Sequence, residues 1–290
     1  MPGGDPVVIV EHLRKVYGDV VAVDDVSFAV QDGEIFGIIG PNGAGKTTTV
    51  ESIQGLRRVD SGTIRVLGFD PQAQAQTLRH RIGAQLQQSS LPDRITVREA
   101  LELFAAFAEN PVAPEQLIEQ WGLVERRDAA FGDLSGGQKQ RLFIALAFVN
   151  DPQVVFLDEL TQGLDPQARH VTWDLIRDIR ARGKTVVLVT HFMDEAETLC
   201  DRVAIIDRGK VVALDTPLGL VDSLDIPTRV RFTSTRDDLP DLAAISGVGR
   251  VERDGANVEV EGSGPVLALV ASALVAHDIL PTDLRAERPT

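Results

Sequence analysis

The chain has little of what marks disulfide-bonded, membrane-spanning or nucleic-acid-binding proteins. Its 290 residues include one cysteine, Cys200, which excludes an intrachain disulfide and a metal site built from several cysteines. The formal net charge is -14, whereas nucleic-acid binders usually present a basic face, so we expect no nucleic-acid partner. The longest apolar run, Val266 to Ala276, is shorter than the roughly 20 residues that cross a bilayer, so we expect no membrane span.

Signals for export and for repetition are also missing. The first residues, Met1 to Pro6, have neither the basic start nor the apolar core of a secretory signal. Together with the single cysteine, this predicts a protein of the reducing cytoplasm. We find no internal repeat and no low-complexity tract, and the length allows one large domain or two.

One glycine-rich stretch, Gly40 to Thr48 (GPNGAGKTT), has the spacing of a backbone cradle for polyphosphate. It follows a short apolar run, Glu34 to Ile39, and precedes a predicted helix. The glycines allow successive N–H groups to converge on phosphate oxygens at the positive end of that helix. In this pattern Lys46 reaches the β- and γ-phosphates, the Thr47 hydroxyl ligates Mg²⁺, and Thr48 adds a phosphate contact.

Two acids follow a second apolar strand, Val154 to Leu157. Asp158 and Glu159 would lie at its carboxyl end, where open α/β sheets bind their ligands. Asp158 would hold Mg²⁺, and Glu159 would polarise the water that attacks the γ-phosphate. The alternative is a solvated acidic pair; the phosphate motif upstream favours the catalytic interpretation.

Three further signals are weaker by themselves. Tyr17 lies between two predicted strands and could stack on a purine, although packing explains a single aromatic as well. His191 follows the predicted strand 185–190, where an imidazole could donate to the γ-phosphate; a lone histidine is more often packed or solvated. The segment from Leu134 to Gln138 opens a helix, either as a glycine-rich cap or as a surface that grips ATP held by another copy or a partner.

The order of the predicted elements indicates an α/β fold that is followed along the chain by a smaller domain. Alternation between Val7 and Val30 predicts an antiparallel β layer, and the buried strands predict a mostly parallel core sheet. Strands are also expected at 61–68 and 82–87. A capping box at Thr96 to Glu99 opens a helical insertion of about residues 97–149, with apolar positions Ala100, Leu103, Phe104 and Phe107. A further helix should run from Pro166 to Arg182.

We expect domains at residues 1–220 and 226–290. The second domain shows alternation at Val230 and Phe232, a hairpin turn at Asp254-Gly255, helices at 239–245 and 266–276, and a last strand at 280–285. This order, β-α-β-β-α-β, predicts a small ferredoxin-like α+β domain.

In combination, the motifs resemble those of ATP-binding subunits of ABC transporters, over about Val7 to Leu220. GPNGAGKTT, LSGGQ at 134–138, VVFLDE at 154–159, GLD at 163–165 and His191 occur in the order of that family. THFMDEAE at 190–197 and the trailing domain are similar to the ATPases of drug- and antibiotic-exporting systems with an ABC-2-type permease. The resemblance implies a P-loop NTPase fold and an ATPase that drives export of a small molecule through a separate membrane permease.

The resemblance also implies a role for individual residues. Tyr17 stacks on adenine, Gln87 senses Mg²⁺ and the permease, and His191 is the γ-phosphate switch. The catalytic residues would be Glu159, His191 and Gln87, and the Mg²⁺ ligands Thr47, Gln87 and Asp158. The ATP phosphates would be bound by Gly40, Asn42, Gly43, Ala44, Gly45, Lys46, Thr47 and Thr48. A second copy of the chain would contact the same ATP through Ser135, Gly136, Gly137, Gln138 and Asp165. The expected location is cytoplasmic, peripheral on the inner face of the cell membrane through the permease.

Two features depart from the family pattern. Leu160 stands where the family usually has proline after the catalytic glutamate, and we expect it to loosen the turn at Glu159 and slow hydrolysis without affecting ATP binding. Family members often continue beyond the point corresponding to Thr290, so we expect the last helix of the C-terminal domain to be missing.

Two alternative functions stay open. One is a nucleotide-gated module that binds ATP without useful hydrolysis, with Leu160 as its mark. The other is an ABC-type ATPase that acts on ribosomes or DNA. The second is disfavoured by the single ATPase cassette, the lack of a long heptad insertion and the sign of the net charge.

Overall fold

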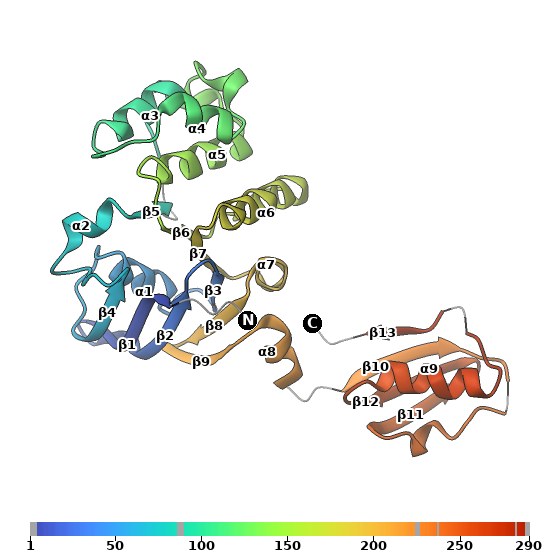
Figure 1. Cartoon of the computed structure of the whole chain (residues 1–290). Helices are drawn as coiled ribbons and strands as arrows, with labels where there is room; N and C mark the ends of the chain where they lie inside the picture. Colours follow the sequence, from blue (N-terminus) through green and yellow to red (C-terminus); the bar gives the residue numbers. More distant parts are fainter. Residues whose placement is uncertain (1–4, 86–89, 224–226, 237, 282, 288–290) are drawn as a thin grey trace. The chain divides into compact units, whose positions relative to one another are not determined.

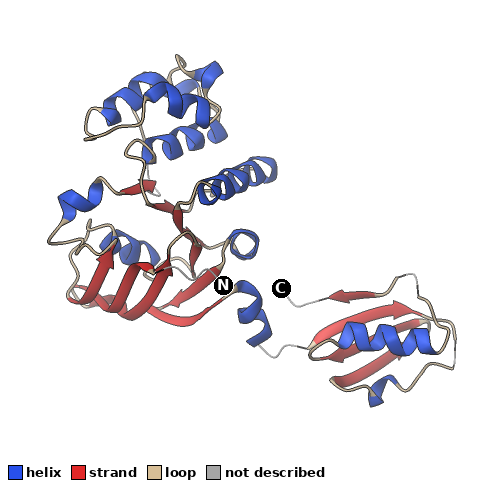
Figure 2. Cartoon of the chain, in the orientation of Figure 1, coloured by secondary structure: helices blue, strands red, loops and turns tan. Residues whose placement is uncertain are grey.

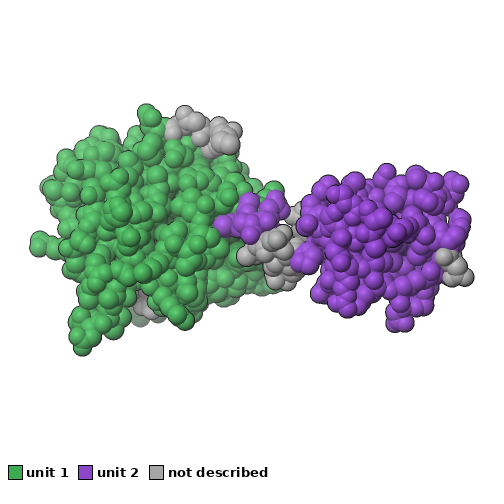
Figure 3. Space-filling model, turned by 90° about the horizontal axis from the view of Figure 1, so that it is seen from below, with its two compact units in different colours: residues 1–218 green, residues 219–290 purple. Residues whose placement is uncertain are grey.

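The computed structural model describes residues 5–85, 90–223, 227–236, 238–281 and 283–287, and the chain divides into two compact units, residues 1–218 and 219–290 (Figures 1 and 3). Each unit has its own hydrophobic core. Figure 2 shows strands flanked by helices in the first unit and one sheet with a helix in the second. The predicted α/β class is confirmed.

The central sheet of the first unit has the strand order β5-β6-β7-β3-β8-β9. All neighbours run parallel except β8 and β9. Every residue of β3, β6 and β7 is buried, which is why these strands appear in the sequence as unbroken apolar runs. The strands are β3 (Ile35–Ile39), β5 (Ile82–Gln85), β6 (Val154–Asp158), β7 (Thr185–Thr190), β8 (Arg202–Asp207) and β9 (Lys210–Asp215).

The predicted antiparallel layer is present as a sheet of order β2-β1-β4. Its strands are β1 (Pro6–Tyr17), β2 (Val20–Gln31) and β4 (Ser61–Val66). The Phe28 ring of β2 stacks on the Phe36 ring of β3, with 5.2 Å between centroids. Val50 and Ile53 of helix α1 (Lys46–Ile53) belong to the same core. Burial of apolar side chains therefore joins the two sheets and α1 into one body.

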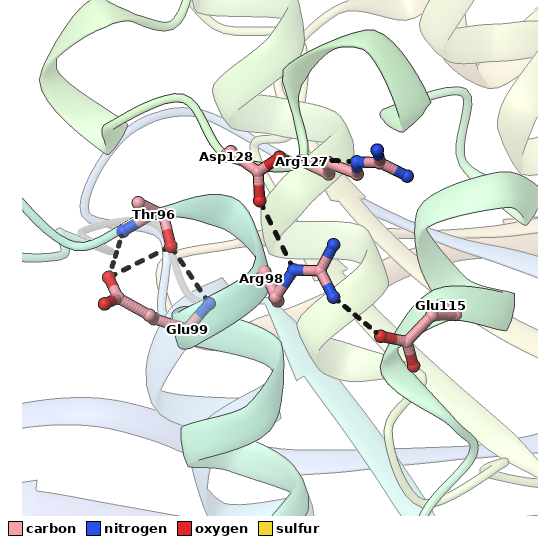
Figure 4. Close-up of polar contacts among 6 residues, drawn as sticks. All are labelled: Thr96, Arg98, Glu99, Glu115, Arg127 and Asp128. Atoms are coloured by element: carbon pink, nitrogen blue, oxygen red, sulfur yellow. Dashed lines mark hydrogen bonds and ion pairs between the residues drawn. The ribbon is translucent and has the colours of Figure 1, made fainter.

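The helical insertion contains α3 (Val97–Ala105), α4 (Pro114–Gln120) and α5 (Gly136–Ala147). The predicted capping box is present, since Thr96 N donates to Glu99 Oε2 at 2.9 Å and Glu99 N donates to Thr96 Oγ1 at 3.2 Å (Figure 4). Next to it, Arg98 pairs with Glu115 at 3.1 Å and Asp128 at 3.4 Å. These pairs tie the start of α3 to α4 and to the loop that follows α4.

The buried side of α3 differs from the apolar pattern that predicted this helix. Val97, Ala100 and Leu101 are buried because α4 and α5 pack on that side. Leu103 is 46% exposed, Phe104 41% and Phe107 77%. Residue 107 also lies beyond the helix, which ends at Ala105.

The remaining helices of the first unit include one predicted element and two that were not expected. Asp165 caps α6 (Pro166–Ala181), and Gly183, with φ of 78°, follows its C-terminus as predicted. The unexpected helices are α2 (Ala75–Arg79) and α7 (Met193–Leu199). The strand predicted for 82–87 is described as β5 only up to Gln85, because residues 86–89 lie outside the described part of the chain.

The second unit begins with α8 (Pro217–Ser223), which straddles the boundary, and has a sheet of order β11-β12-β10-β13 with antiparallel neighbours. The elements are β10 (Thr228–Thr233), β11 (Val248–Asp254), β12 (Asn257–Gly262), α9 (Val266–Ala276) and β13 (Arg285–Glu287). The strands follow the expected ferredoxin-like order with a 3₁₀ turn in place of the first helix, and the hairpin turn at Gly255 and α9 lie where they were predicted. In the described part of the chain, no helix combines the length and apolar character needed to span a bilayer.

Two boundaries in this unit were predicted wrongly. The helix expected at 239–245 is a 3₁₀ turn, Leu242–Ala244, because the Asp241 side chain accepts from Ala243 N and the chain is extended again at Ile245. The last strand is Arg285–Glu287 rather than 280–285. Ile279 enters the core whereas Leu280 is exposed, so the chain reaches the sheet edge later than its apolar residues indicated.

Separate cores predict that damage to one unit stays in that unit. Leu274→Ala removes a fully buried side chain of α9, and we expect a loss of roughly 2–5 kcal/mol in the stability of the second unit. Hydrogen exchange of the full chain should show faster exchange in β10, β12 and α9 and unchanged protection in β3, β6 and β7. Leu267→Ala, at an exposed position of the same helix, is the control with little effect. Equal deprotection of both units would contradict independent cores.

Candidate functional site

The candidate site lies at one edge of the central sheet, where three adjacent strands end. In the order β6-β7-β3, Asp158 is paired with Val189, and Ile39 with Thr190. Because these strands are parallel, the residues that follow them come out at the same edge. The glycine-rich loop follows β3, Asp158 is the last residue of β6 and Glu159 follows it, and His191 follows β7. Segments distant in sequence are therefore brought together as predicted.

The loop from Gly40 to Gly45 leads directly into the N-terminus of α1. Gly45 has a φ of 101°, and a Cβ there would lie 2.3 Å from the Ala22 carbonyl oxygen. A Cβ at Gly40 would lie 2.0 Å from the Ile206 carbonyl oxygen. The loop therefore packs closely against β2 and β8, and only glycine fits at these two positions.

A cavity of about 290 Å³ is formed over this loop. Every predicted phosphate ligand except Gly40 lines it, together with Ala22 and Glu159. The lining residues are Ala22, Asn42, Gly43, Ala44, Gly45, Lys46, Thr47, Thr48 and Glu159. A helix N-terminus, a lysine and two threonines facing one cavity form a site suited to a polyphosphate.

The Lys46 side chain is nearly buried and folds back over its own loop. Its Nζ donates to the carbonyl oxygens of Gly40 at 2.7 Å and Pro41 at 3.1 Å. Burial lowers the pKa of Lys46, while the nearby carboxylates of Glu159 and Asp158 act in the opposite direction. Phosphate oxygens are stronger acceptors than these carbonyl groups and would compensate the desolvated ammonium better.

Asp158, the last residue of β6, is 4% exposed. Burial, followed by the charge of Glu159, raises the pKa of Asp158 to about 6, and a hydrogen bond from Thr47 acts in the opposite direction. Its Oδ1 is buried and has no hydrogen-bond partner among the described residues. An unpaired carboxylate oxygen beside a hydroxyl fits a hard cation such as Mg²⁺. The described residues contain no cluster of three or more His, Cys, Asp or Glu that could hold a metal ion.

The side chains of Glu159 and His191 are in contact. His191 Nδ1 lies 3.3 Å from Glu159 Oε1, and the Glu159 side chain is largely buried. The Glu159 backbone has a φ of 49°, a conformation that is uncommon outside glycine, so the turn after β6 aims this side chain in a specific direction. Leu160 follows as a buried residue. Its expected effect on hydrolysis stays a prediction.

A second cavity, of about 330 Å³, shares no lining residue with the first. Ser135, Gly137, Gln138 and Asp165 line it, so the structure brings most of the predicted second ATP-contacting set together; Gly136 does not line it. Ser135 caps α5 by accepting from Gln138 N at 3.3 Å, and Asp165 caps α6 by accepting from Ala168 N at 2.9 Å. Two helix N-termini therefore open onto one cavity.

Sequence analysis missed further residues lining this second cavity. Arg141 lies one helical turn after Gln138 on α5, and Gln167 lies in the first turn of α6. The i, i+3 spacing from Gln138 is the signal that would have placed Arg141 at the cavity.

Asp158, His191 and Tyr17 line neither cavity, and Gln87 lies outside the described residues. Tyr17, at the end of β1, is 41% exposed and does not line the phosphate cavity. Its hydroxyl accepts from Arg57 Nη1 at 3.1 Å, and Lys15 Nζ lies 5.2 Å from its ring centroid. Gln87 lies outside the described residues, so its assigned roles stay predictions.

Comparison with known proteins agrees with this geometry. A family model described as ABC transporter matches residues 23–162. The Nod factor export ATP-binding protein I of Burkholderia orbicola (strain AU 1054) is 46% identical over 219 residues, which cover 73% of this chain and 71% of that protein. The chain belongs to the ABC transporter ATP-binding family.

Solved structures of this family show the same fold as the first unit. A structure of an ATP-binding subunit of an ABC transporter has a TM-score of 0.67 and 31% identity, and covers 75% of this chain and 92% of its own. A dimeric, post-hydrolysis structure of the ATP-binding cassette MJ0796 with ADP and Pi has a TM-score of 0.64 and 26% identity. The match covers 72% of this chain and 98% of that chain. The predicted P-loop NTPase fold is confirmed, and the chain is an ATP-binding ABC ATPase.

The buried carboxyl of Asp158 predicts a pH-dependent stability of the nucleotide-free protein. The raised pKa means that the folded state favours the neutral carboxyl of Asp158. The contribution of this group to the free energy of unfolding is therefore complete below about pH 4 and is lost as the pH rises through about 6. Asp158→Asn removes the ionisation. We expect the variant to become more stable than the wild type at pH 7.5, by on the order of 1–3 kcal/mol, and similar to it near pH 4.

Denaturant unfolding without Mg²⁺ or nucleotide measures this difference across pH 4 to 8. Asp174→Asn, at an exposed aspartate paired with Arg177, is the control that should leave the pH profile in place. A pH-independent difference between Asp158→Asn and the wild type would contradict the buried carboxyl as its source.

Proposed function

We propose that this ABC ATPase closes as a homodimer around two ATP molecules and drives export of a small molecule of drug or antibiotic type through a separate membrane permease. One observation carries the proposal: each chain has a phosphate cavity formed by the loop after β3 and by Glu159 after β6, and a second, disjoint cavity at the N-termini of α5 and α6. The second cavity has no phosphate-binding loop of its own. It is suited to the exposed side of a nucleotide held by another copy.

In the proposed site the chain's own residues bind the nucleotide and orient the attacking water. Gly40, Asn42, Gly43, Ala44, Gly45, Lys46, Thr47 and Thr48 bind the phosphates. Glu159 orients and polarises the water, and His191, in contact with Glu159, donates to the γ-phosphate. Tyr17 stacks on adenine, with its hydroxyl bound to Arg57.

Mg²⁺ would be held by Thr47, Asp158 and Gln87. When bound, it supplies charge neutralisation of the β- and γ-phosphates. The orphaned, buried Oδ1 of Asp158 supports this assignment.

Across the proposed dimer, Ser135, Gly136, Gly137, Gln138 and Asp165 contact the ATP of the partner copy. The dimeric state of a structural relative that holds ADP and Pi supports this arrangement. We assign ATP binding to a domain of residues 1–220 with a helical subdomain at about 97–149, and we treat residues 226–290 as a separate α+β domain.

Export and location are proposed from the relatives. Two relatives, 46% and 45% identical to this chain, are named for export of Nod factor, which supports an exporting system but does not define the compound carried here. The ATPase would be cytoplasmic and peripheral on the inner face of the cell membrane through its permease. The contact between Glu159 and His191 favours hydrolysis over a module that only binds ATP, and the net charge disfavours DNA or ribosomal RNA as partner.

Glu159→Gln tests the proposed base. We expect ATP turnover to fall by about 10²-fold or more, because the water loses its acceptor, while the MgATP-bound dimer accumulates. Steady-state hydrolysis and light scattering measure the two effects. Glu197→Gln, at an exposed position of α7, should keep wild-type turnover. Wild-type turnover in Glu159→Gln would remove Glu159 from the mechanism.

Gly137→Glu tests the second cavity. A Cβ at this position would meet no atom within 4 Å, and an acid is tolerated in the first turn of α5, so the monomer should fold normally. Its carboxylate would face the γ-phosphate of the partner's ATP. In the Glu159→Gln background we expect the MgATP-dependent dimer to disappear while each monomer still binds ATP. A dimer of unchanged stability in that double variant would show that this surface is not the interface.

A further inference from the structure

Arg169 lies in the first turn of α6 and makes two contacts with the segment that follows His191. Its guanidinium carbon lies 4.5 Å from the ring centroid of Phe192, within the range of a cation–π contact. Its Nη1 lies 3.1 Å from Asp194 Oδ2. Arg169 Nε is buried without a hydrogen-bond partner among the described residues. The guanidinium therefore binds an aromatic face and a carboxylate of the same short segment.

The contacts continue from Phe192 to the proposed catalytic base. The Phe192 ring lies 4.1 Å from the His191 ring, centroid to centroid, and His191 Nδ1 lies 3.3 Å from Glu159 Oε1. The Phe192 ring is thus in contact with both the His191 imidazole and the Arg169 guanidinium. A movement of His191 toward or away from a γ-phosphate would change the contact of Phe192 with Arg169.

In the other direction, Arg169 is joined to the second cavity through its own helix. Arg169 N donates to the carbonyl oxygen of Asp165 at 2.9 Å, and the Asp165 side chain accepts from Ala168 N at 2.9 Å. Asp165, Gln167 and Ala168 line the second cavity. The single helical turn between Asp165 and Arg169 is rigid because both hydrogen bonds close it.

We propose that Arg169 is a positioning residue that couples the His191 segment to the first turn of α6, so that the two nucleotide-facing surfaces of one chain adopt their active geometry together. The inference rests on the proposed function, because it takes His191 and Asp165 to face ATP. It adds a residue that lines neither cavity. Arginine suits this task because a planar guanidinium stacks on a ring and pairs with a carboxylate at the same time, whereas lysine offers a point charge.

A neighbouring ion pair shows what a purely local contact looks like. Arg177, two turns further along α6, pairs with Asp174 of the same helix at 2.8 Å, and both side chains are largely exposed. Such a pair contributes little to stability and connects no second element. Arg177→Ala is therefore the matched control for Arg169→Ala: it removes an arginine with an aspartate partner from the same helix.

The first measurement separates nucleotide binding from turnover. Arg169→Ala leaves the phosphate cavity intact, so ATP affinity of the monomer should be unchanged, while kcat falls about tenfold. Arg169→Lys should recover part of this loss, and Arg177→Ala should keep the wild-type kcat. Thermal melting of each variant checks folding. If Arg169→Ala unfolds, Arg169→Lys carries the test through its own reduced kcat.

The second measurement is a double-mutant cycle with His191→Ala under single-turnover conditions. If Arg169 acts through His191, then Arg169→Ala should cost less than about twofold in the His191→Ala background. Independent, multiplying losses would overturn the coupling, as would a raised KM with unchanged kcat. If Arg169→Ala keeps the wild-type rate while His191→Ala is slow, the role of Arg169 is contradicted and the proposed function is not. A wild-type rate in His191→Ala would overturn the role of His191 in the proposed function and the coupling with it.

Discussion

The parallel pairing of β6 with β7 and of β7 with β3 is the interaction on which the site depends. Each of these strands is buried along its whole length, so their relative register is held by backbone hydrogen bonds and by apolar packing on both faces. A displacement of one strand would move its terminal residue away from the others. The phosphate loop, Asp158 and His191 are thus positioned by strands that are buried along their whole length.

The same burial gives the site its electrostatic character. Asp158 and Lys46 are both nearly excluded from water, and burial shifts the pKa of each toward its neutral form. Desolvated groups of opposite charge interact strongly with phosphate and with a cation, because little solvent has to be displaced when the ligand arrives. Burial of Asp158 and Lys46 therefore raises the free energy of the nucleotide-free protein. Binding of a magnesium nucleotide would offset this desolvation cost.

The proposed coupling between the two cavities runs through short segments rather than through the core. The backbone turn at Glu159 has positive φ, the rings of His191 and Phe192 are in contact, and α6 begins with a capped turn. Each of these features restricts a loop that lies next to a buried strand. In the proposed coupling, a small displacement at one cavity would reach the other through these segments without a rearrangement of the sheet.

Local signals in the sequence determined the glycine-rich loop, the caps at Thr96, Ser135 and Asp165, the apolar strands and the hairpin at Gly255. They act over a few residues, through sterics and through backbone groups that need a partner, so they are visible without a fold. Only the tertiary structure decided which strand ends are neighbours, that α3 leaves Leu103 and Phe104 exposed, that residues 239–245 form one 3₁₀ turn, and that Arg169 reaches Phe192. Those outcomes depend on contacts between residues far apart in the chain, whose energies no local pattern contains.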